Sequence, residues 1–290
     1  LKKYNCRSAA ILGIIIFLMS FRIKVILLIC LILSIFFVKA INQKIISFAI
    51  DSNSVSEAPR ITPLTSIVAP VLVYHYVEVV TDEKDTIRKS LNTPPYLFIK
   101  QIETLKNAGY TFITASELID ILDGKIKLIQ KPVLITFDDG YRDFYTDVFP
   151  ILKKYNIKAT AYIVSGFLDK PNYMFTWQLK QIARSRLVEI GAHTVHHYSL
   201  KGLPSTLTKY EIEESKKNLE EIISTPVVSF AYPDGSFDEQ TIKIVKESGF
   251  KSAATTMHGF ETNQENKYSI YRIHPGDKTD SYLINFLEQK

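Results

Sequence analysis

From residue 70 to the end of the chain, short apolar or β-branched runs alternate with amphipathic segments of helical period. This alternation constrains the fold most, because a strand that leads into a helix has to cross over the sheet before a parallel strand can pair with it. Repeated units of this kind predict a parallel sheet with helices on the outside. Some seven units favour an α/β fold, namely an irregular (β/α)7-type barrel with a single catalytic domain at 70–290.

The expected strands are 71–74, 111–114, 132–137, 159–164, 188–192, 227–231, 253–255 and 270–273. The expected helices are 96–108, 114–122, 143–155, 176–185, 208–223, 236–248 and 281–288. Three of these helices begin with the capping-box pattern Ser/Thr-x-x-Glu, at Thr114, Thr208 and Ser236. No Gly-x-Gly-x-x-Gly pattern follows the first strand, which argues against a dinucleotide-binding fold.

The N-terminal segment, residues 1–41, is apolar and basic. Its second hydrophobic run, residues 25–38, would be about 21 Å long as a helix, against a hydrocarbon core of about 30 Å. The segment therefore predicts a signal peptide, or a membrane anchor if neighbouring apolar residues extend it. The chain begins with Leu, and we expect translation to start at Met19, just before a short basic stretch and the apolar run.

The net charge of +5 comes from this same segment. Six of the 35 basic residues and none of the 30 acidic ones lie within residues 1–39, so the rest of the chain is nearly neutral and no nucleic-acid partner is expected. Both cysteines, Cys6 and Cys30, lie here too. The positive-inside rule predicts a protein secreted or anchored to the outer face of the membrane, with a Ser/Thr/Pro-rich linker at 42–69.

Two adjacent carboxylates, Asp138 and Asp139, directly follow the apolar strand predicted at 132–137, and Gly140 comes next. In a parallel barrel, chemistry lies at the carboxyl ends of the strands. Neighbouring side chains there point in different directions, so one carboxylate could bind a cation while the other faces a substrate. Taken alone, Asp-Gly is also a common turn signal.

Three of the six histidines fall within residues 193–197 (HTVHH), directly after the strand predicted at 188–192. A spacing of four places His193 and His197 on one side of a helical turn, where both imidazoles can bind one divalent metal ion. With Asp139 they form a His₂Asp set that leaves coordination positions open for water and substrate. This set suits zinc first, with cobalt, nickel and iron as alternatives. A solvated polar loop is the other interpretation of the histidines.

Residues 136–140 (TFDDG) and 193–197 (HTVHH), in this order and spacing, resemble the motif pair of the polysaccharide deacetylases, the carbohydrate esterase family 4 with its NodB-homology domain. The resemblance extends from about residue 70 to the C-terminus. It implies that Asp138 is the general base and that Asp139, His193 and His197 hold the metal. The implied reaction is metal-assisted hydrolysis, in which Asp138 takes a proton from the water that attacks the acetyl carbonyl.

The third motif departs from the family pattern. Most members have Arg-x-Pro-Tyr-Gly, whereas residues 231–235 read AYPDG. The arginine that would orient the base is therefore missing, and Arg272 is a candidate to replace it. We expect Tyr232, Pro233 and Asp234 to contact the substrate, with a backbone N–H of this motif near the oxyanion.

Ala at the Arg position is similar to the branch of the family that de-N-acetylates poly-β-1,6-N-acetylglucosamine in biofilms. Residues 70–77 (PVLVYHYV) resemble the first-strand motif of that branch, in which the histidine is a candidate general acid, here His75. His274 occupies roughly the place of the family's usual late catalytic histidine and is the competing acid. Residues 174–177 (MFTW) resemble the segment that supplies an aromatic wall, which makes Trp177 a candidate substrate contact.

The predicted function is metal-dependent removal of N-acetyl groups from an N-acetylglucosamine polymer, with the β-1,6-linked biofilm polymer first. A peptidoglycan or chitin-type deacetylase is the alternative on the same chemistry. A carbohydrate-binding module with a degenerate site is an alternative of a different class. Asp143 and Asp147, on the helix after the first motif, are interpreted as surface charges.

Overall fold

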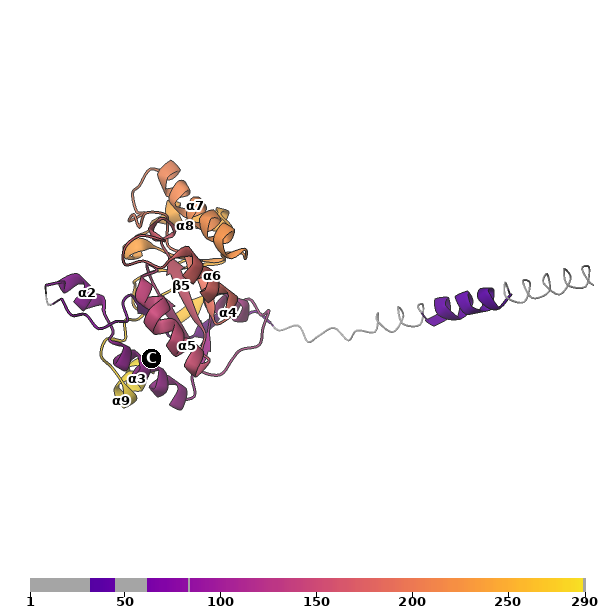
Figure 1. The fold of residues 1–290 in the computed structure, drawn as a ribbon, viewed down its shortest axis with the longest axis horizontal. Coiled ribbons are helices and arrows are strands. Elements are labelled where there is room, and N and C mark those ends of the chain that lie inside the picture. The colour runs from indigo at the N-terminus through magenta and orange to yellow at the C-terminus, as the bar shows by residue number, and fades with distance from the viewer. Residues whose placement is uncertain (1–31, 45–61, 83, 289–290) are drawn as a thin grey trace, which may run out of the picture. The chain divides into compact units, whose positions relative to one another are not determined.

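The computed structural model describes residues 32–44, 62–82 and 84–288 (Figure 1). The chain divides into two compact units, Leu1–Arg60 and Ile61–Lys290. The second unit holds every residue to which the sequence assigns chemistry, so its architecture decides how those residues meet.

In the first unit, residues 32–44 form a helix whose side chains are exposed. Within the described parts of the chain, no helix combines the length and apolar character needed to cross a membrane. Met19 and most of the signal peptide or anchor predicted at 1–41 lie outside the described residues.

A seven-stranded parallel sheet forms the centre of the second unit. Its strands are β2 (Val71–Tyr74), β3 (Thr111–Ile113), β4 (Pro132–Phe137), β5 (Ala159–Ile163), β6 (Val188–Ala192), β7 (Ser229–Ala231) and β8 (Ser252–Ala254). They follow the order β2-β4-β5-β6-β7-β8, and β3 pairs with the first half of β4. This arrangement places the ends of β2, β4, β5 and β6 next to one another.

A segment near the C-terminus connects the two edges of this sheet. Ile273 pairs with Leu72 of β2, and Ile270 pairs with Ala254 of β8. The sheet therefore curls into the irregular α/β barrel that the strand–helix alternation predicts. Residues 270–273 form two isolated bridges instead of the regular strand expected there.

Helices connect the strands and lie outside the sheet (Figure 1). They are α2 (Thr86–Leu91), α3 (Pro95–Asn107), α4 (Ala115–Leu122), α5 (Phe149–Tyr155), α6 (Thr176–Arg184), α7 (Ser205–Ile223), α8 (Glu239–Glu247) and α9 (Asp280–Leu287). Shorter helical turns are the π-helix η1 (Phe144–Val148) and the 3-10 helices η2 (Ser165–Phe167) and η3 (Pro233–Gly235). The helix predicted at 143–155 is thus divided into η1 and α5.

A second, antiparallel sheet joins β1 (Ser66–Val68) to β9 (Glu261–Asn263). Just before β1, the N–H of Leu64 donates to the carbonyl of Leu122 at the end of α4 (2.9 Å). Both contacts fall within residues 42–69, the stretch interpreted as a linker. The folded body therefore includes the last part of that stretch.

The alternation of side chains along β4 divides the core into two clusters, because successive residues of a strand point to opposite faces. Val133, Ile135 and Phe137 pack in the larger cluster, with residues of the outer helices. Leu134 packs in the smaller cluster, whose other members include Tyr162, Ala231, Ala254 and Ile270. All six residues of β4 are buried, which rigidly positions the two carboxylates that follow it.

Two of the three predicted capping boxes are wrong. Thr114 does cap α4, with its side chain and that of Glu117 each bound to the other's backbone N–H. In contrast, α7 begins at Ser205 after Pro204, so Thr208 and Glu211 lie inside the helix and are buried. At α8 the cap is Asp238, whose side chain accepts from the N–H of Thr241, and not Ser236.

Candidate active site

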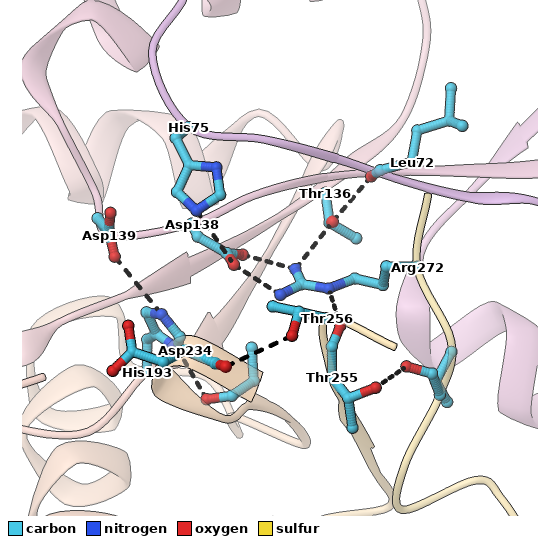
Figure 2. Close-up of polar contacts among 12 residues, drawn as sticks. Leu72, His75, Thr136, Asp138, Asp139, His193, Asp234, Thr255, Thr256 and Arg272 are labelled. Atoms are coloured by element: carbon cyan, nitrogen blue, oxygen red, sulfur yellow. Dashed lines mark hydrogen bonds and ion pairs between the residues drawn. The ribbon is translucent and has the colours of Figure 1, made fainter. Parts of the chain in front are cut away.

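The chemistry-bearing side chains meet at one end of the barrel, where neighbouring parallel strands terminate (Figure 2). Asp138 and Asp139 follow the last residue of β4, His193 follows that of β6, and His75 follows that of β2. Because these strands run parallel, their carboxyl ends share one edge of the sheet. Residues separated by more than fifty positions in sequence, His75 and Asp138 as well as Asp139 and His193, are thereby brought close together.

Asp139, His193 and His197 place their ligand atoms within 4.8 Å of one another. Asp139 Oδ1 lies 3.2 Å from His197 Nε2 and 3.5 Å from His193 Nε2. This buried oxygen makes no hydrogen bond of good geometry with either ring. The structure therefore brings together all three residues that the sequence nominates as metal ligands.

The imidazole of His193 is oriented by the backbone. Its Nδ1 lies 2.7 Å from the carbonyl oxygen of Ala231. A carbonyl only accepts hydrogen bonds, so Nδ1 carries the proton and Nε2 keeps its lone pair toward Asp139. A carboxylate oxygen without a hydrogen-bond partner, facing an imidazole lone pair, fits a divalent cation, and these three residues could hold one.

The same arrangement explains the electrostatics of Asp139 and His197. Burial alone would raise the pKa of Asp139, but when no metal is bound the positive charge of protonated His193 and His197 rings outweighs burial and holds this pKa well below its usual range. For His197, burial acts to lower the pKa, while the carboxylate of Asp139 and then that of Asp234 raise it above the usual value. The site thus keeps Asp139 ionised, as a metal ligand must be.

Asp138 is held by Arg272 through two hydrogen bonds (Figure 2). Nη1 of Arg272 lies 2.7 Å from Asp138 Oδ1, and Nη2 lies 2.6 Å from Oδ2. The guanidinium also donates to the carbonyl of Thr255 (2.7 Å) and to Oγ1 of Thr136 (3.2 Å). Arg272 therefore orients the expected base and fills the position that the altered third motif leaves open.

This pair is completely enclosed, because Arg272 is 2% and Asp138 3% exposed. Burial would raise the pKa of Asp138, but the charge of Arg272 outweighs it and holds this pKa below its usual range. The carboxylate is consequently ionised near neutral pH, which a general base requires.

The two candidate acids, His75 and His274, differ in their distance from the base. His75 Nε2 lies 4.0 Å from Asp138 Oδ2, and Nδ1 of the same ring is buried without a hydrogen-bond partner. His274 is more exposed, and its Nδ1 accepts the N–H of Gly276 (3.2 Å). Burial, the nearby His75 and Lys278 lower the pKa of His274. The geometry favours His75, and the assignment of the acid stays a prediction.

The third motif contributes its residues in unequal ways. Tyr232 is fully buried and its hydroxyl donates to the carbonyl of Tyr268 (3.0 Å), so its side chain does not face solvent. The expected substrate contact of Tyr232 stays a prediction. Pro233 is buried as well. Asp234 is exposed, adopts a positive φ of 56° and accepts a hydrogen bond from Ser199. Only Asp234 presents its side chain to solvent.

Trp177 is 57% exposed at the start of α6. Its ring meets that of Tyr145 edge-on, with centroids 5.3 Å apart, and lies nearly parallel to Phe175 at 6.5 Å. An exposed indole face bordered by aromatic rings is a surface on which sugar rings can stack. The predicted substrate contact of Trp177 is therefore available.

Sequence reasoning missed a row of stacked tyrosines beside Asp139. Tyr76 stacks on Tyr141 with centroids 3.9 Å apart, and Tyr141 stacks on Tyr173 at 5.0 Å. Burial, with a further contribution from the charge of Asp139, raises the pKa of all three hydroxyls, that of Tyr76 to about 12. The nearness of Tyr76 to His75 and of Tyr141 to Asp139 in sequence was the available signal.

Asp143 is buried, so its interpretation as a surface charge is wrong. Its Oδ2 accepts the N–H of Val77 (2.5 Å). Burial, with help from the neighbouring Glu78, raises the pKa of Asp143 to about 7. The amphipathic pattern gave no signal for this contact, because Val77 lies on a loop 66 positions away in sequence.

The barrel, with the Asp-Asp pair after β4 and the His-x-x-x-His pair after β6 at one edge of the sheet, defines a polysaccharide deacetylase site. The family model for polysaccharide deacetylase matches residues 125–253. YxkH of Bacillus subtilis, which is named for the same family, is 30% identical over 204 residues, or 70% of each chain. This chain belongs to the polysaccharide deacetylase family, and it is an enzyme of that class.

Other relatives connect the chain to particular deacetylases. Poly-beta-1,6-N-acetyl-D-glucosamine N-deacetylase of Staphylococcus aureus is 29% identical over 201 residues, covering 64% of this chain and 69% of that protein. The Streptococcus pyogenes deacetylase PplD, in complex with acetate, has a TM-score of 0.69 at 28% identity over 77% of this chain and 98% of its own. IcaB from Ammonifex degensii has a TM-score of 0.66 at 25% identity over 78% and 98%.

Proposed function

We propose that this deacetylase is metal-dependent and removes N-acetyl groups from poly-β-1,6-N-acetylglucosamine. The observation that carries metal dependence is the convergence of Asp139, His193 and His197 beside the Arg272-bound carboxylate of Asp138. The polymer is supported by the Staphylococcus aureus relative, which is named for that substrate.

The residues of the site divide the work of amide hydrolysis. Asp139, His193 and His197 would hold the cation, zinc first, which when bound acts as a Lewis acid and lowers the pKa of water. Asp138, kept ionised by Arg272, takes a proton from the attacking water.

His75 supplies the other proton transfer. Water adds to the acetyl carbon, the C–N bond breaks, and the leaving amine takes a proton from His75 as acetate departs. His75 Nε2 lies 4.0 Å from Asp138 Oδ2, so the proposed acid and base border the same point of the site.

We further propose that the enzyme acts outside the cytoplasm. The basic, apolar segment at 1–41 supports this, as export or anchoring by such a segment would deliver the catalytic domain to an extracellular polymer. Cell fractionation with an antibody against the catalytic domain tests it. Recovery of the enzyme in the cytoplasmic fraction would contradict the proposal.

The function itself is tested by acetate release from defined oligosaccharides of N-acetylglucosamine. We expect faster release from β-1,6-linked than from β-1,4-linked oligomers, loss of activity after treatment with a chelator, and recovery on adding zinc, cobalt, nickel or iron. Asp138→Asn serves as the inactive control. Preference for β-1,4-linked oligomers would favour a peptidoglycan or chitin-type substrate, and full turnover by metal-stripped protein would disprove metal dependence.

A further inference from the structure

Glu211 is a fully buried carboxylate that contacts the loop carrying the histidine ligands. It lies in α7, seven positions after Pro204, the residue that precedes the helix. Its Oε2 accepts the backbone N–H groups of Val195 (2.9 Å) and His196 (2.8 Å), and its Oε1 lies 2.6 Å from Nδ1 of His196. All three contacts fall between the two histidines expected to bind metal.

The opposite side of this loop is held by the loop after β5. The N–H of Ser165 donates to the carbonyl of Thr194 (3.1 Å), and the N–H of Gly166 donates to that of Val195 (3.0 Å). A side chain at Gly166 would collide with the Val195 carbonyl oxygen, since an added Cβ would lie 2.5 Å from it. The loop is therefore clamped between the backbone after β5 and the carboxylate of Glu211.

The loop needs such a clamp because its backbone is strained. Thr194 and His197 both have positive φ, 65° and 60°, and this region is especially unfavourable for Thr194 because its side chain is β-branched. This conformation turns the chain back so that His197 faces Asp139. Without external hydrogen bonds, relaxation of the two residues would move the His197 ring away.

The two histidine ligands depend on Glu211 to different extents. His193 follows directly on β6, and its ring is fixed separately by the carbonyl of Ala231. His197 lies beyond the clamped amides, and its own N–H is bound only within the loop, by Oγ1 of Thr194 (2.9 Å). Loss of the carboxylate should therefore displace His197 and leave His193 in place.

We propose that Glu211 is a positioning residue of the metal site, which aims His197 at the metal by binding the backbone of Val195 and His196. This inference rests on the proposed metal dependence. Glu211 acts through the loop and does not contact the reacting atoms.

The test measures zinc affinity of the full-length protein, by competition with a chromophoric chelator, for the wild type, Glu211→Gln and Glu211→Asp. Gln removes the negative charge and has an NH₂ group in place of one acceptor oxygen. Asp keeps the charge, but its shorter side chain holds the carboxylate farther from the amides of Val195 and His196. We expect both to bind zinc about 10–100-fold more weakly, the range typical when a residue that supports a metal ligand is lost. Thermal unfolding of the metal-free proteins identifies any variant that does not fold.

A double-mutant cycle with His197→Ala makes the test specific. If Glu211 acts only through His197, then Glu211→Gln should weaken zinc binding no further once His197 is replaced. Additive losses would overturn the proposal. Wild-type zinc affinity in a folded Glu211→Gln or Glu211→Asp protein would overturn it as well.

Glu189→Gln is the matched control. Glu189 lies on β6, the strand that precedes the histidine loop, and like Glu211 it accepts a backbone N–H, here from Ser116 (2.8 Å), together with the hydroxyl of Ser229 (2.7 Å). Neither of these contacts is with the histidine loop, so replacing Glu189 should reduce the free energy of unfolding and leave zinc affinity unchanged. A wild-type protein that binds no zinc would refute the proposed metal dependence, which is a result distinct from zinc binding that is insensitive to Glu211.

Discussion

Arg272 binds Asp138 through two parallel N–H···O hydrogen bonds of 2.6 and 2.7 Å, although the two residues lie 134 positions apart in sequence. The segment 270–273, which bridges both edge strands of the barrel, places Arg272 inside it. This location lets the arginine reach the end of β4 from the C-terminal part of the chain. Asp138 is therefore oriented by an arginine outside the third motif, in which Ala231 occupies the usual arginine position.

Arg272→Lys should impair the base and change its pH dependence. Lysine keeps a positive charge but cannot form the two parallel hydrogen bonds. We expect kcat/KM to fall about 10²-fold, as for a misplaced catalytic group. Because Arg272 lowers the pKa of Asp138, its loss raises this pKa, and the acid limb of the kcat/KM profile should move to higher pH. Arg88→Lys, at a half-buried surface pair with Glu78, is the control, and an unmoved acid limb would contradict the assignment.

Replacement of His75 should cost much more activity than replacement of His274. His75 is the ring within 4.0 Å of the base, and loss of a general acid typically lowers the rate about 10²–10⁴-fold. We expect His75→Ala to lose at least about 10²-fold in kcat and His274→Ala less than about tenfold. An aryl acetate ester, whose leaving group needs no proton, should be hydrolysed by His75→Ala with a smaller deficit. Equal or reversed losses on the polysaccharide would overturn the assignment.

Asp143→Asn should stabilise the protein at alkaline pH. The pKa of Asp143 is about 7 in the folded protein and near 3.8 in the unfolded chain. As the pH rises, the unfolded chain therefore loses this proton at a lower pH than the folded protein does. The stability associated with the neutral carboxyl is complete below about pH 4 and is lost as the pH rises toward 7. Asparagine stays neutral and can still accept the N–H of Val77, so we expect a gain of about 2–4 kcal/mol at pH 8 that vanishes near pH 4.

Urea unfolding of wild type and Asp143→Asn between pH 4 and pH 8 measures this difference. Asp147→Asn, on the same short helix, should change the free energy of unfolding by less than about 0.5 kcal/mol. A stability difference between Asp143→Asn and wild type that does not vary with pH would refute the prediction.

Trp177 provides an intrinsic probe for substrate binding, because it is the only tryptophan of the chain. If a sugar ring stacks on its exposed face, oligosaccharide should change the fluorescence of the wild type. Trp177→Phe keeps a smaller ring, and Trp177→Ala removes it. We expect Trp177→Ala to raise KM about tenfold with little change in kcat, corresponding to a stacking contribution of about 1.4 kcal/mol. Unchanged fluorescence at saturating oligosaccharide would exclude the contact.

Tyr232→Phe should affect stability and not catalysis. The substitution removes the hydroxyl that donates to the carbonyl of Tyr268 and retains the ring that stacks on Phe237. We expect a loss of about 1 kcal/mol in the free energy of unfolding, with kcat and KM within twofold of the wild type. A large loss of kcat with an unchanged free energy of unfolding would contradict this prediction and indicate that the Tyr232 hydroxyl takes part in catalysis.

Local patterns predicted the scaffold well wherever one physical rule dominated. The buried run 132–137 matches β4 at both ends, since a short, fully apolar segment followed by two carboxylates has few other stable conformations. The prediction that His193 and His197 face one point is confirmed, but the expected helical turn is wrong, because residues 193–197 form a loop with positive φ at Thr194 and His197. The capping box predicted at Thr208-x-x-Glu211 is wrong because the helix begins earlier, after Pro204. The sequence pattern alone does not show whether its residues start a helix or are buried inside one.

The sequence by itself determined the reaction class, because the order of strands and the residues that follow them specify which side chains lie at the carboxyl ends of a parallel barrel. Only the tertiary structure decided which residues support those side chains. Arg272 reaches Asp138, Glu211 binds the histidine loop and Asp143 binds Val77 across long sequence separations. Such contacts depend on how the barrel closes and how α7 packs. Because burying an unpaired charge costs several kcal/mol in lost hydration, each buried carboxylate needs a partner, and the tertiary structure decides which residue that is.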